Sequence, residues 1–112
     1  MMQIARWTAE VAIMNKYLPQ FAAFKTKNGS VGFCGRVRGR RTGREYTILV
    51  KVPARRYPEM EPAVYIHPRI GLGHWNPDGS LSFERKTPWL PAGNTFANCV
   101  IVAIQFLEKF DQ

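Results

Sequence analysis

The sequence predicts an α+β fold, in which an antiparallel four-stranded meander is covered on one face by two helices. Apolar residues recur at spacings of three and four near both ends of the chain, which indicates amphipathic helices. Between them, apolar and polar residues alternate in short runs separated by turn residues, which is typical of antiparallel strands. With 112 residues, of which 46% are hydrophobic, we expect one folded domain over residues 1–112.

The N-terminal helix is predicted from a stripe of apolar residues at helical spacing. The members of this stripe are Ile4, Trp7, Val11, Met14 and Leu18. Pro19 is expected to end the helix, because its ring blocks a regular helical hydrogen bond.

Four strands are predicted to follow this helix. They are Phe21–Lys27, Val31–Arg38, Glu45–Val52 and Ala63–His67. Asn28-Gly29 and Gly39–Arg44 supply the first two turns, and Pro53 closes the third strand.

A long loop and a final helix complete the predicted fold. Residues 68–94 contain Gly and Pro repeatedly and show no period, which predicts a long loop of the kind that carries active sites. Asn94 or Thr95 is the expected N-cap of the last helix. Its predicted apolar stripe consists of Phe96, Val100, Ala103, Ile104, Leu107 and Phe110.

The net charge of +8 is unevenly distributed along the chain. Residues 1–56 carry 12 basic and 2 acidic side chains, whereas residues 57–112 carry 4 and 6. Five of the basic residues cluster on one predicted hairpin: Arg36, Arg38, Arg40, Arg41 and Arg44. This cluster is either a solvated hairpin or a docking surface for an acidic protein. Nucleic acid is a less favoured partner, because Phe24 and Phe33 are better explained as core residues than as stacking residues.

The sequence indicates a cytoplasmic protein without a membrane partner. It has no apolar run of about 18 residues and no N-terminal signal pattern. The two cysteines, Cys34 and Cys99, are therefore expected to be free thiols in a reducing compartment.

Three motifs occur in order along the second half of the chain. They are Tyr57-Pro58-Glu59-Met60-Glu61-Pro62, Gly79-Ser80-Leu81-Ser82 and Trp89-Leu90-Pro91. In spacing and character they resemble the Tyr-Pro-x-x-x-Pro, Gly-x-Leu-Cys and Trp-x-Pro motifs of ubiquitin-conjugating enzymes. The resemblance covers nearly the whole chain and implies a UBC-like fold. The chain looks like a minimal bacterial version, since the family commonly adds two more helices.

Ser82 occupies the position of the family's catalytic cysteine. In the family this cysteine accepts the C-terminus of a ubiquitin-like protein as a thioester. A serine hydroxyl has a far higher pKa than a thiol, so ordinary thioester transfer is not expected here. Three accounts remain open: a catalytically silent variant, an engineered change from Cys to Ser, or a different nucleophile.

Further site residues are His74, Asn76 and the two cysteines. By resemblance to the family's His-Pro-Asn, His74 or Asn76 marks the side that stabilises an oxyanion. Their alternatives are a loop histidine bonded to backbone and a tight turn over residues 76–79. Cys99 is the alternative nucleophile, because it lies about one turn into the last helix, where the dipole lowers a thiol pKa. The alternative for Cys99 is a buried structural thiol. Cys34 lies on the same predicted strand as Arg36 and Arg38, whose positive charge favours a thiolate.

The resemblance implies a bacterial transferase of a ubiquitin-like conjugation pathway, similar to those of anti-phage operons that encode a cyclic-oligonucleotide synthase. It would bind the C-terminal tail of a ubiquitin-like protein, or of the synthase, for ester or thioester transfer. The alternatives are a non-catalytic scaffold that binds a protein partner and a basic nucleic-acid-binding domain. No cofactor is implied, and no metal site is expected, since His67 and His74 lack paired ligand spacing with the cysteines.

Overall fold

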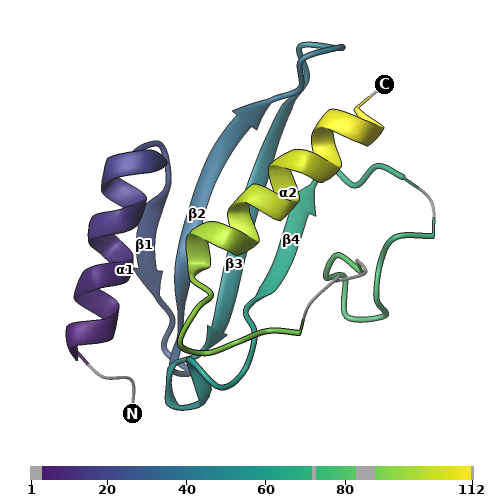
Figure 1. The fold of residues 1–112 in the computed structure, drawn as a ribbon. Helices are drawn as coiled ribbons and strands as arrows, with labels where there is room; N and C mark the ends of the chain where they lie inside the picture. Colours follow the sequence, from purple (N-terminus) through teal and green to yellow (C-terminus); the bar gives the residue numbers. More distant parts are fainter. Residues whose placement is uncertain (1–3, 72, 83–87, 112) are drawn as a thin grey trace.

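The computed structural model describes residues 4–71, 73–82 and 88–111, and it has an α+β fold. Its elements are α1 (Ile4–Tyr17), β1 (Ala22–Lys25), β2 (Ser30–Arg38), β3 (Glu45–Pro53), the short 3-10 helix η1 (Ala54–Arg56), β4 (Ala63–His67) and α2 (Phe96–Phe110). The strands form one antiparallel sheet in the order β1-β2-β3-β4 (Figure 1). The predicted order of helix, meander, loop and helix is confirmed. Neither helix of the described chain has the length and apolar composition needed to cross a membrane.

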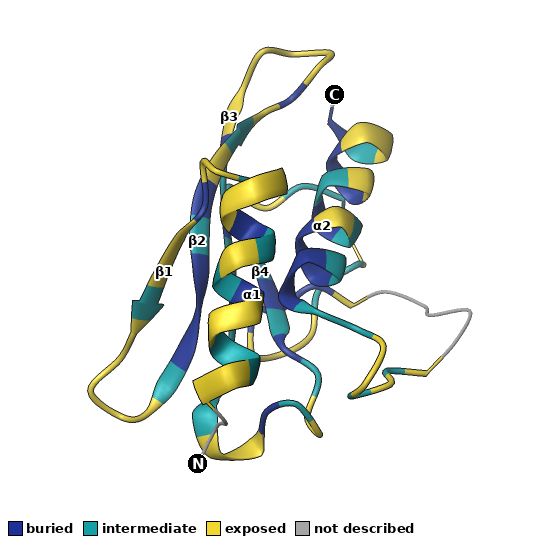
Figure 2. Cartoon of the chain, turned by 60° about the vertical axis from the view of Figure 1, so that its left-hand side comes forward, coloured by how far each residue is buried: buried dark blue, intermediate teal, exposed yellow. Residues whose placement is uncertain are grey.

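The core lies between the sheet and the two helices. Alternate residues of β3, from Tyr46 to Val52, are buried, which confirms the predicted alternation. The Trp7 ring of α1 lies 5.2 Å from Phe33 of β2 and 5.9 Å from Phe96 of α2, measured between centroids. Both helices therefore cover the same face, and their buried positions are on the sides that meet the sheet (Figure 2).

The predicted helix stripes differ from the buried faces at particular residues. Ile4 is 82% exposed at the start of α1, whereas Trp7 at the end of the first turn already packs against the core. Glu10 is instead buried on the inner face of α1, although the apolar pattern omits it. On α2 the buried face also contains Cys99 and Phe106. The first strand is shorter than predicted, and Phe21 packs into the core ahead of it. Phe24 was predicted to be a core residue, but it pairs with Gly32 and is half-buried on the uncovered face of the sheet, because its strand position alternates with that of the inward-facing residues.

A hydrogen-bonded network, which we call the Glu10 hub, joins α1 to the rest of the molecule. The Glu10 carboxylate accepts hydrogen bonds from the Phe96 N–H (3.0 Å), from Arg6 Nε (2.9 Å) and from the Tyr57 hydroxyl. Burial, followed by the neighbouring carboxylate, raises the pKa of Tyr57, so its phenol remains a donor. Three donors, of which Arg6 is half-buried, thus offset the cost of burying this carboxylate.

Arg6 extends the hub to the segment before α2. Its guanidinium donates to the carbonyl oxygens of Pro91 (2.7 Å) and Asn94 (2.6 Å). Of the two N-caps predicted for α2, the structure has Thr95 and not Asn94. Thr95 forms a capping box with Asn98. Asn94 instead accepts a hydrogen bond from the backbone N–H of Leu90.

A second buried carboxylate, Asp111, ties the end of α2 to the β2–β3 hairpin. It accepts hydrogen bonds from the Thr42 hydroxyl (2.6 Å), the Tyr46 hydroxyl (2.9 Å) and the N–H groups of Arg41 and Thr42. A Cβ on Gly39 would lie 2.1 Å from the carboxylate, so this approach requires glycine. The hydrogen bonds, led by that from Thr42, hold the pKa of Asp111 below its ordinary value.

Replacing Glu10 with Ala is expected to lower the free energy of unfolding by about 3 kcal/mol, because it leaves three buried or half-buried donors without an acceptor. Urea denaturation of both proteins measures this difference. The matched control is Glu59→Gln at an exposed position, expected to change stability by less than about 0.5 kcal/mol. Equal stability of Glu10→Ala and the control would contradict the role of the hub.

Asp111→Asn is expected to make folding stability less sensitive to acid. A lowered native pKa stabilises the fold above the unfolded pKa of about 3.9, and this contribution is lost as the pH falls through the native pKa. Thermal melts from about pH 2.5 to about pH 7 should therefore show the two proteins converging at the acid end. The exposed Glu108→Gln is the control, and parallel curves for wild type and Asp111→Asn would refute the linkage.

Candidate functional site

Residues 74–82, which we call the Ser82 hairpin, place Ser82 opposite His74. The Ser82 N–H donates to the His74 carbonyl (2.7 Å), and Trp75 and Leu81 form an antiparallel bridge. At the tip, the Gly79 N–H donates to the Asn76 carbonyl (2.9 Å). Gly79 has a φ of +92°, which favours glycine at this position of the turn.

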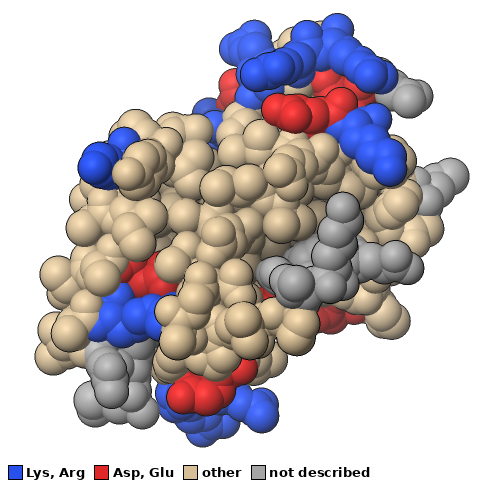
Figure 3. Space-filling model, in the orientation of Figure 1, with Lys and Arg blue, Asp and Glu red and all other residues tan. Residues whose placement is uncertain are grey.

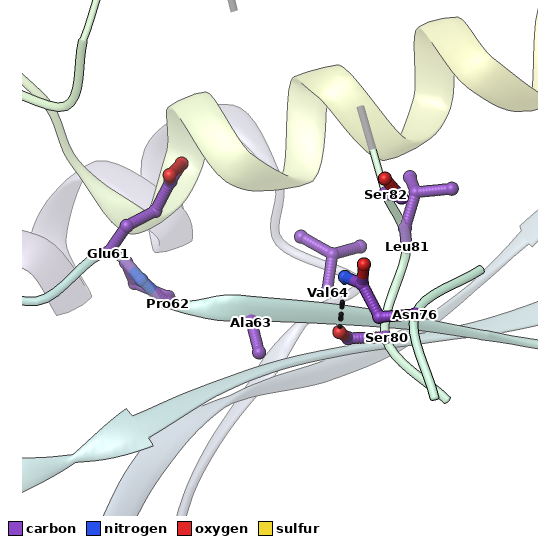
Figure 4. Close-up of a pocket in the computed structure, with 8 residues that line it drawn as sticks. All are labelled: Glu61, Pro62, Ala63, Val64, Asn76, Ser80, Leu81 and Ser82. Atoms are coloured by element: carbon purple, nitrogen blue, oxygen red, sulfur yellow. Dashed lines mark hydrogen bonds between the residues drawn. The ribbon is translucent and has the colours of Figure 1, made fainter. Parts of the chain in front are cut away.

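The side chains of the turn bond mainly to one another. The buried Ser80 hydroxyl donates to Asp78 Oδ1 (2.6 Å) and accepts from Asn76 Nδ2 (3.0 Å; Figure 4). The Ser80 hydroxyl and the Ser80 N–H, both of which donate to Asp78, lower the pKa of that carboxyl. The structure therefore engages the Asn76 amide in holding the turn, as the tight-turn alternative predicts.

The Ser82 hairpin is attached to the free edge of the sheet. β4 is an edge strand, and its Val64 carbonyl accepts a hydrogen bond from the Leu81 N–H (2.7 Å). Leu81 is buried, whereas the next residue, Ser82, is exposed. The alternation of this extended segment therefore directs Ser82 away from the core.

The imidazole of His74 packs against α2. Its ring centroid lies 4.5 Å from that of Phe110 and 5.5 Å from that of Phe106. His74 thus contributes its backbone carbonyl to the position of Ser82 and its ring to an aromatic cluster.

Two hollows meet at Ser82. The first, which we call the β4-side hollow, has a volume of about 360 Å³ and is lined by residues that include Pro62, Val64 and Asn76 (Figure 4). The second, the α2-side hollow, has a volume of about 660 Å³ and is lined by residues that include Gln105 and Lys109. Because Ser82 borders both, a narrow ligand that crosses this residue has space on either side.

Two of the three sequence motifs contact each other. Trp89 donates its indole N–H to the Pro58 carbonyl (2.7 Å), and its ring lies 6.2 Å from that of Tyr57. Pro91 accepts from Arg6 in the Glu10 hub. These residues therefore connect the loop before α2 to the β3–β4 connection. Pro62 and residues 80–82 line the β4-side hollow, and Gly79 lies in the turn of the Ser82 hairpin.

The cysteines lie away from the two hollows. Cys99 is fully buried in the core, as expected for a structural thiol, and its sulfur is inaccessible to a partner in this conformation. Cys34 is half-buried on the uncovered face of the sheet, where its strand neighbours are Ala22 and Leu49. The five arginines from Arg36 to Arg44 are exposed on the β2–β3 hairpin and line neither hollow.

Sequence reasoning missed several residues at this site. Gln105 and Lys109 are four residues apart, so they lie on the same side of α2, beside its apolar stripe. This spacing was the signal in the sequence that could have identified them. His67-Pro68-Arg69 begins at the last residue of β4 and shares two residues with the His-Pro-Asn motif sought at His74 and Asn76. The Arg69 guanidinium lies 5.6 Å from the centroid of the Trp75 ring and packs against Gly79.

A Ser82→Cys variant is expected to contain one rapidly reacting thiol that wild type lacks. Because position 82 is exposed and Cys99 is fully buried, a soluble disulfide reagent should modify the introduced thiol quickly and Cys99 only after unfolding. Cys34, which is half-buried, is the internal reference. The reaction is followed by absorbance, and the modified residue is identified by peptide mass spectrometry. Modification of Cys99 in the folded protein as fast as the introduced thiol would contradict this arrangement.

No group of three potential metal-binding residues is placed to hold an ion within the described ranges. The chain matches no protein-family model, no curated protein and no solved structure.

Proposed function

We propose that this chain is a ubiquitin-conjugating-like protein that binds the C-terminal tail of a ubiquitin-like protein across Ser82 without forming a thioester. The observation that carries the proposal is the exposure of Ser82 between two hollows, one beside β4 and one beside α2. The three sequence motifs and the α+β fold are compatible with this family.

The surroundings of Ser82 favour binding over chemistry. A serine needs a base to become a nucleophile at neutral pH. The carboxylate of Asp78 accepts two hydrogen bonds from Ser80, and the ring of His74 packs on Phe106 and Phe110. Among the described residues, no carboxylate or imidazole hydrogen-bonds to the Ser82 hydroxyl. A non-catalytic binding module therefore fits this site better than a transferase.

The shape of the site favours a tail over a folded surface. Ser82 lies at the end of a narrow two-stranded hairpin, and it borders both hollows. An extended chain fills such a path, because its backbone is narrow and its alternate side chains point to opposite sides. The tail of a cyclic-oligonucleotide synthase is the second candidate ligand.

A second candidate function is acceptance of an acyl group by the Ser82 oxygen, and the exposure of that hydroxyl favours it. In this reaction the hydroxyl oxygen attacks the terminal carbonyl of an activated tail and forms the new C–O bond. The C–S bond to the activating group breaks, its sulfur leaves as a thiolate, the hydroxyl proton passes to solvent, and an oxyester remains.

The proposal predicts that Ser82→Cys converts the tail-binding site into an acyl-accepting one. The probe is ubiquitin that carries a mercaptoethanesulfonate thioester at its C-terminus, and the product is followed by intact-protein mass spectrometry. We expect Ser82→Cys to form a thiol-labile adduct at least about tenfold faster than an exposed cysteine placed elsewhere, because the groove holds the tail beside the sulfur. Wild type should form none.

The matched control is Thr8→Cys, an exposed position on α1 outside both hollows. Equal rates for the two variants would show that the groove does not hold the tail, and would refute the proposal. A hydroxylamine-labile, thiol-resistant adduct on Ser82 of wild type would replace it with the second candidate function.

A further inference from the structure

Positive charge gathers on a surface that lies outside the proposed tail site. The arginines between residues 36 and 44 are all exposed on the β2–β3 hairpin, which we call the Arg hairpin. Figure 3 shows basic side chains over this end of the molecule, whereas the middle of the same face carries few charges. A surface of this kind binds acidic ligands.

The backbone of the Arg hairpin is held in place by the fold. The Gly39 N–H donates to the Arg44 carbonyl (2.8 Å), and the Gly43 N–H donates to the Gly39 carbonyl (3.0 Å). Asp111 accepts from the N–H groups of Arg41 and Thr42, which fixes the tip against the end of α2. A ligand that binds here orders side chains only, and this lowers the entropic cost of binding.

The spacing of the arginines on β2 matches an extended peptide. Arg36 and Arg38 are two residues apart on one strand, so both lie on the uncovered face of the sheet and about 6.7 Å apart. An extended peptide with acidic residues at alternate positions has the same repeat. Arg36 already forms an exposed ion pair with Glu45 (3.2 Å), which shows a carboxylate within reach of this row.

Acidic groups among the arginines disfavour a nucleic acid. Glu108 and Asp111 line a hollow of about 150 Å³ together with Arg40 and Arg41. A continuous phosphate backbone would be repelled by these carboxylates, whereas separate peptide carboxylates can be spaced to avoid them. Within the described Arg hairpin and the residues that flank it, the aromatic side chain is that of Tyr46, which is fully buried and offers no stacking surface for a base.

We propose that the Arg hairpin is a docking surface for an extended acidic segment of a protein partner, separate from the tail site at Ser82. The segment lies along the uncovered face of β2, and its carboxylates bind the guanidinium groups of Arg36 and Arg38. Its adjoining acidic residues reach Arg40 and Arg41 at the tip.

The test uses a capped nine-residue peptide with Asp at alternate positions, and it measures the dissociation constant by fluorescence anisotropy at fixed salt. The triple variant Arg38→Glu, Arg40→Glu and Arg41→Glu is expected to weaken binding by at least about tenfold, since charge-assisted hydrogen bonds are lost. The matched control is Lys25→Glu, Lys27→Glu and Arg55→Glu, which makes the same change in net charge at exposed positions outside the hairpin. It is expected to bind the peptide within about twofold of wild type, because charges beyond the Debye length are largely screened.

Backbone amide spectra of each variant show whether it is folded. If the charge-reversed triple variant of the hairpin does not fold, the variant with Gln at the same three positions is measured in its place. Equal weakening in the two charge-reversed variants would overturn the proposal in favour of diffuse attraction. The proposal also fails if the peptide does not bind, or if a 12-base-pair DNA duplex binds the hairpin more tightly than the peptide does. Acyl acceptance by Ser82→Cys is measured in the same variants, so failure at one site is distinguished from failure at the other.

Discussion

The architecture depends on a carboxylate that α1 supplies to the N-terminus of α2. α2 has no acidic residue in its own first turn, and Glu10 accepts the hydrogen bond of the Phe96 N–H at this position. The negative charge is favourable there, because the helix dipole is positive at its N-terminus. The same carboxylate binds Arg6 and Tyr57, which connects it to the β3–β4 connection and to the loop before α2. One buried group thus fixes the helix that forms a wall of the α2-side hollow.

The other end of α2 presents the opposite electrostatic situation. Asp111 follows the helix, where the dipole is negative and an acidic group is unfavourable. Hydrogen bonds from Thr42, Tyr46 and two backbone N–H groups offset this cost. The arrangement connects α2 to the hairpin that carries the arginines, whose positive charge also reduces the repulsion. Both ends of α2 are therefore held by carboxylates. One side of the helix lines the hollow beside Ser82, and its C-terminal end supports the Arg hairpin.

The sequence predicted the regular elements well, because periodicity reports burial directly. The alternation of Tyr46, Ile48, Val50 and Val52 and the limits of β4 agree with the structure. The roles of Glu10 and Asp111 could not be predicted, since each binds partners that are distant along the chain. The candidate site was predicted in part. The turn at residues 76–79 could be predicted, because its residue types act on neighbours that are close along the chain. The hollow beside Lys109 could not, because it forms only when α2 lies next to the Ser82 hairpin.

The geometry at Ser82 separates the requirements of binding from those of chemistry. The path across Ser82 is formed by backbone bonds, namely those from Ser82 to His74 and from Leu81 to Val64, and these bonds do not depend on the side chain at position 82. Serine and cysteine are close in size, so exchanging one for the other at position 82 leaves the shape of the two hollows unchanged, whereas it changes the pKa of the side chain. The polar side chains of the turn bond to one another, as Asn76, Asp78 and Ser80 do, and do not activate the hydroxyl. The proposed tail-binding function has the same requirement, because it needs a defined path at Ser82 and no activated nucleophile.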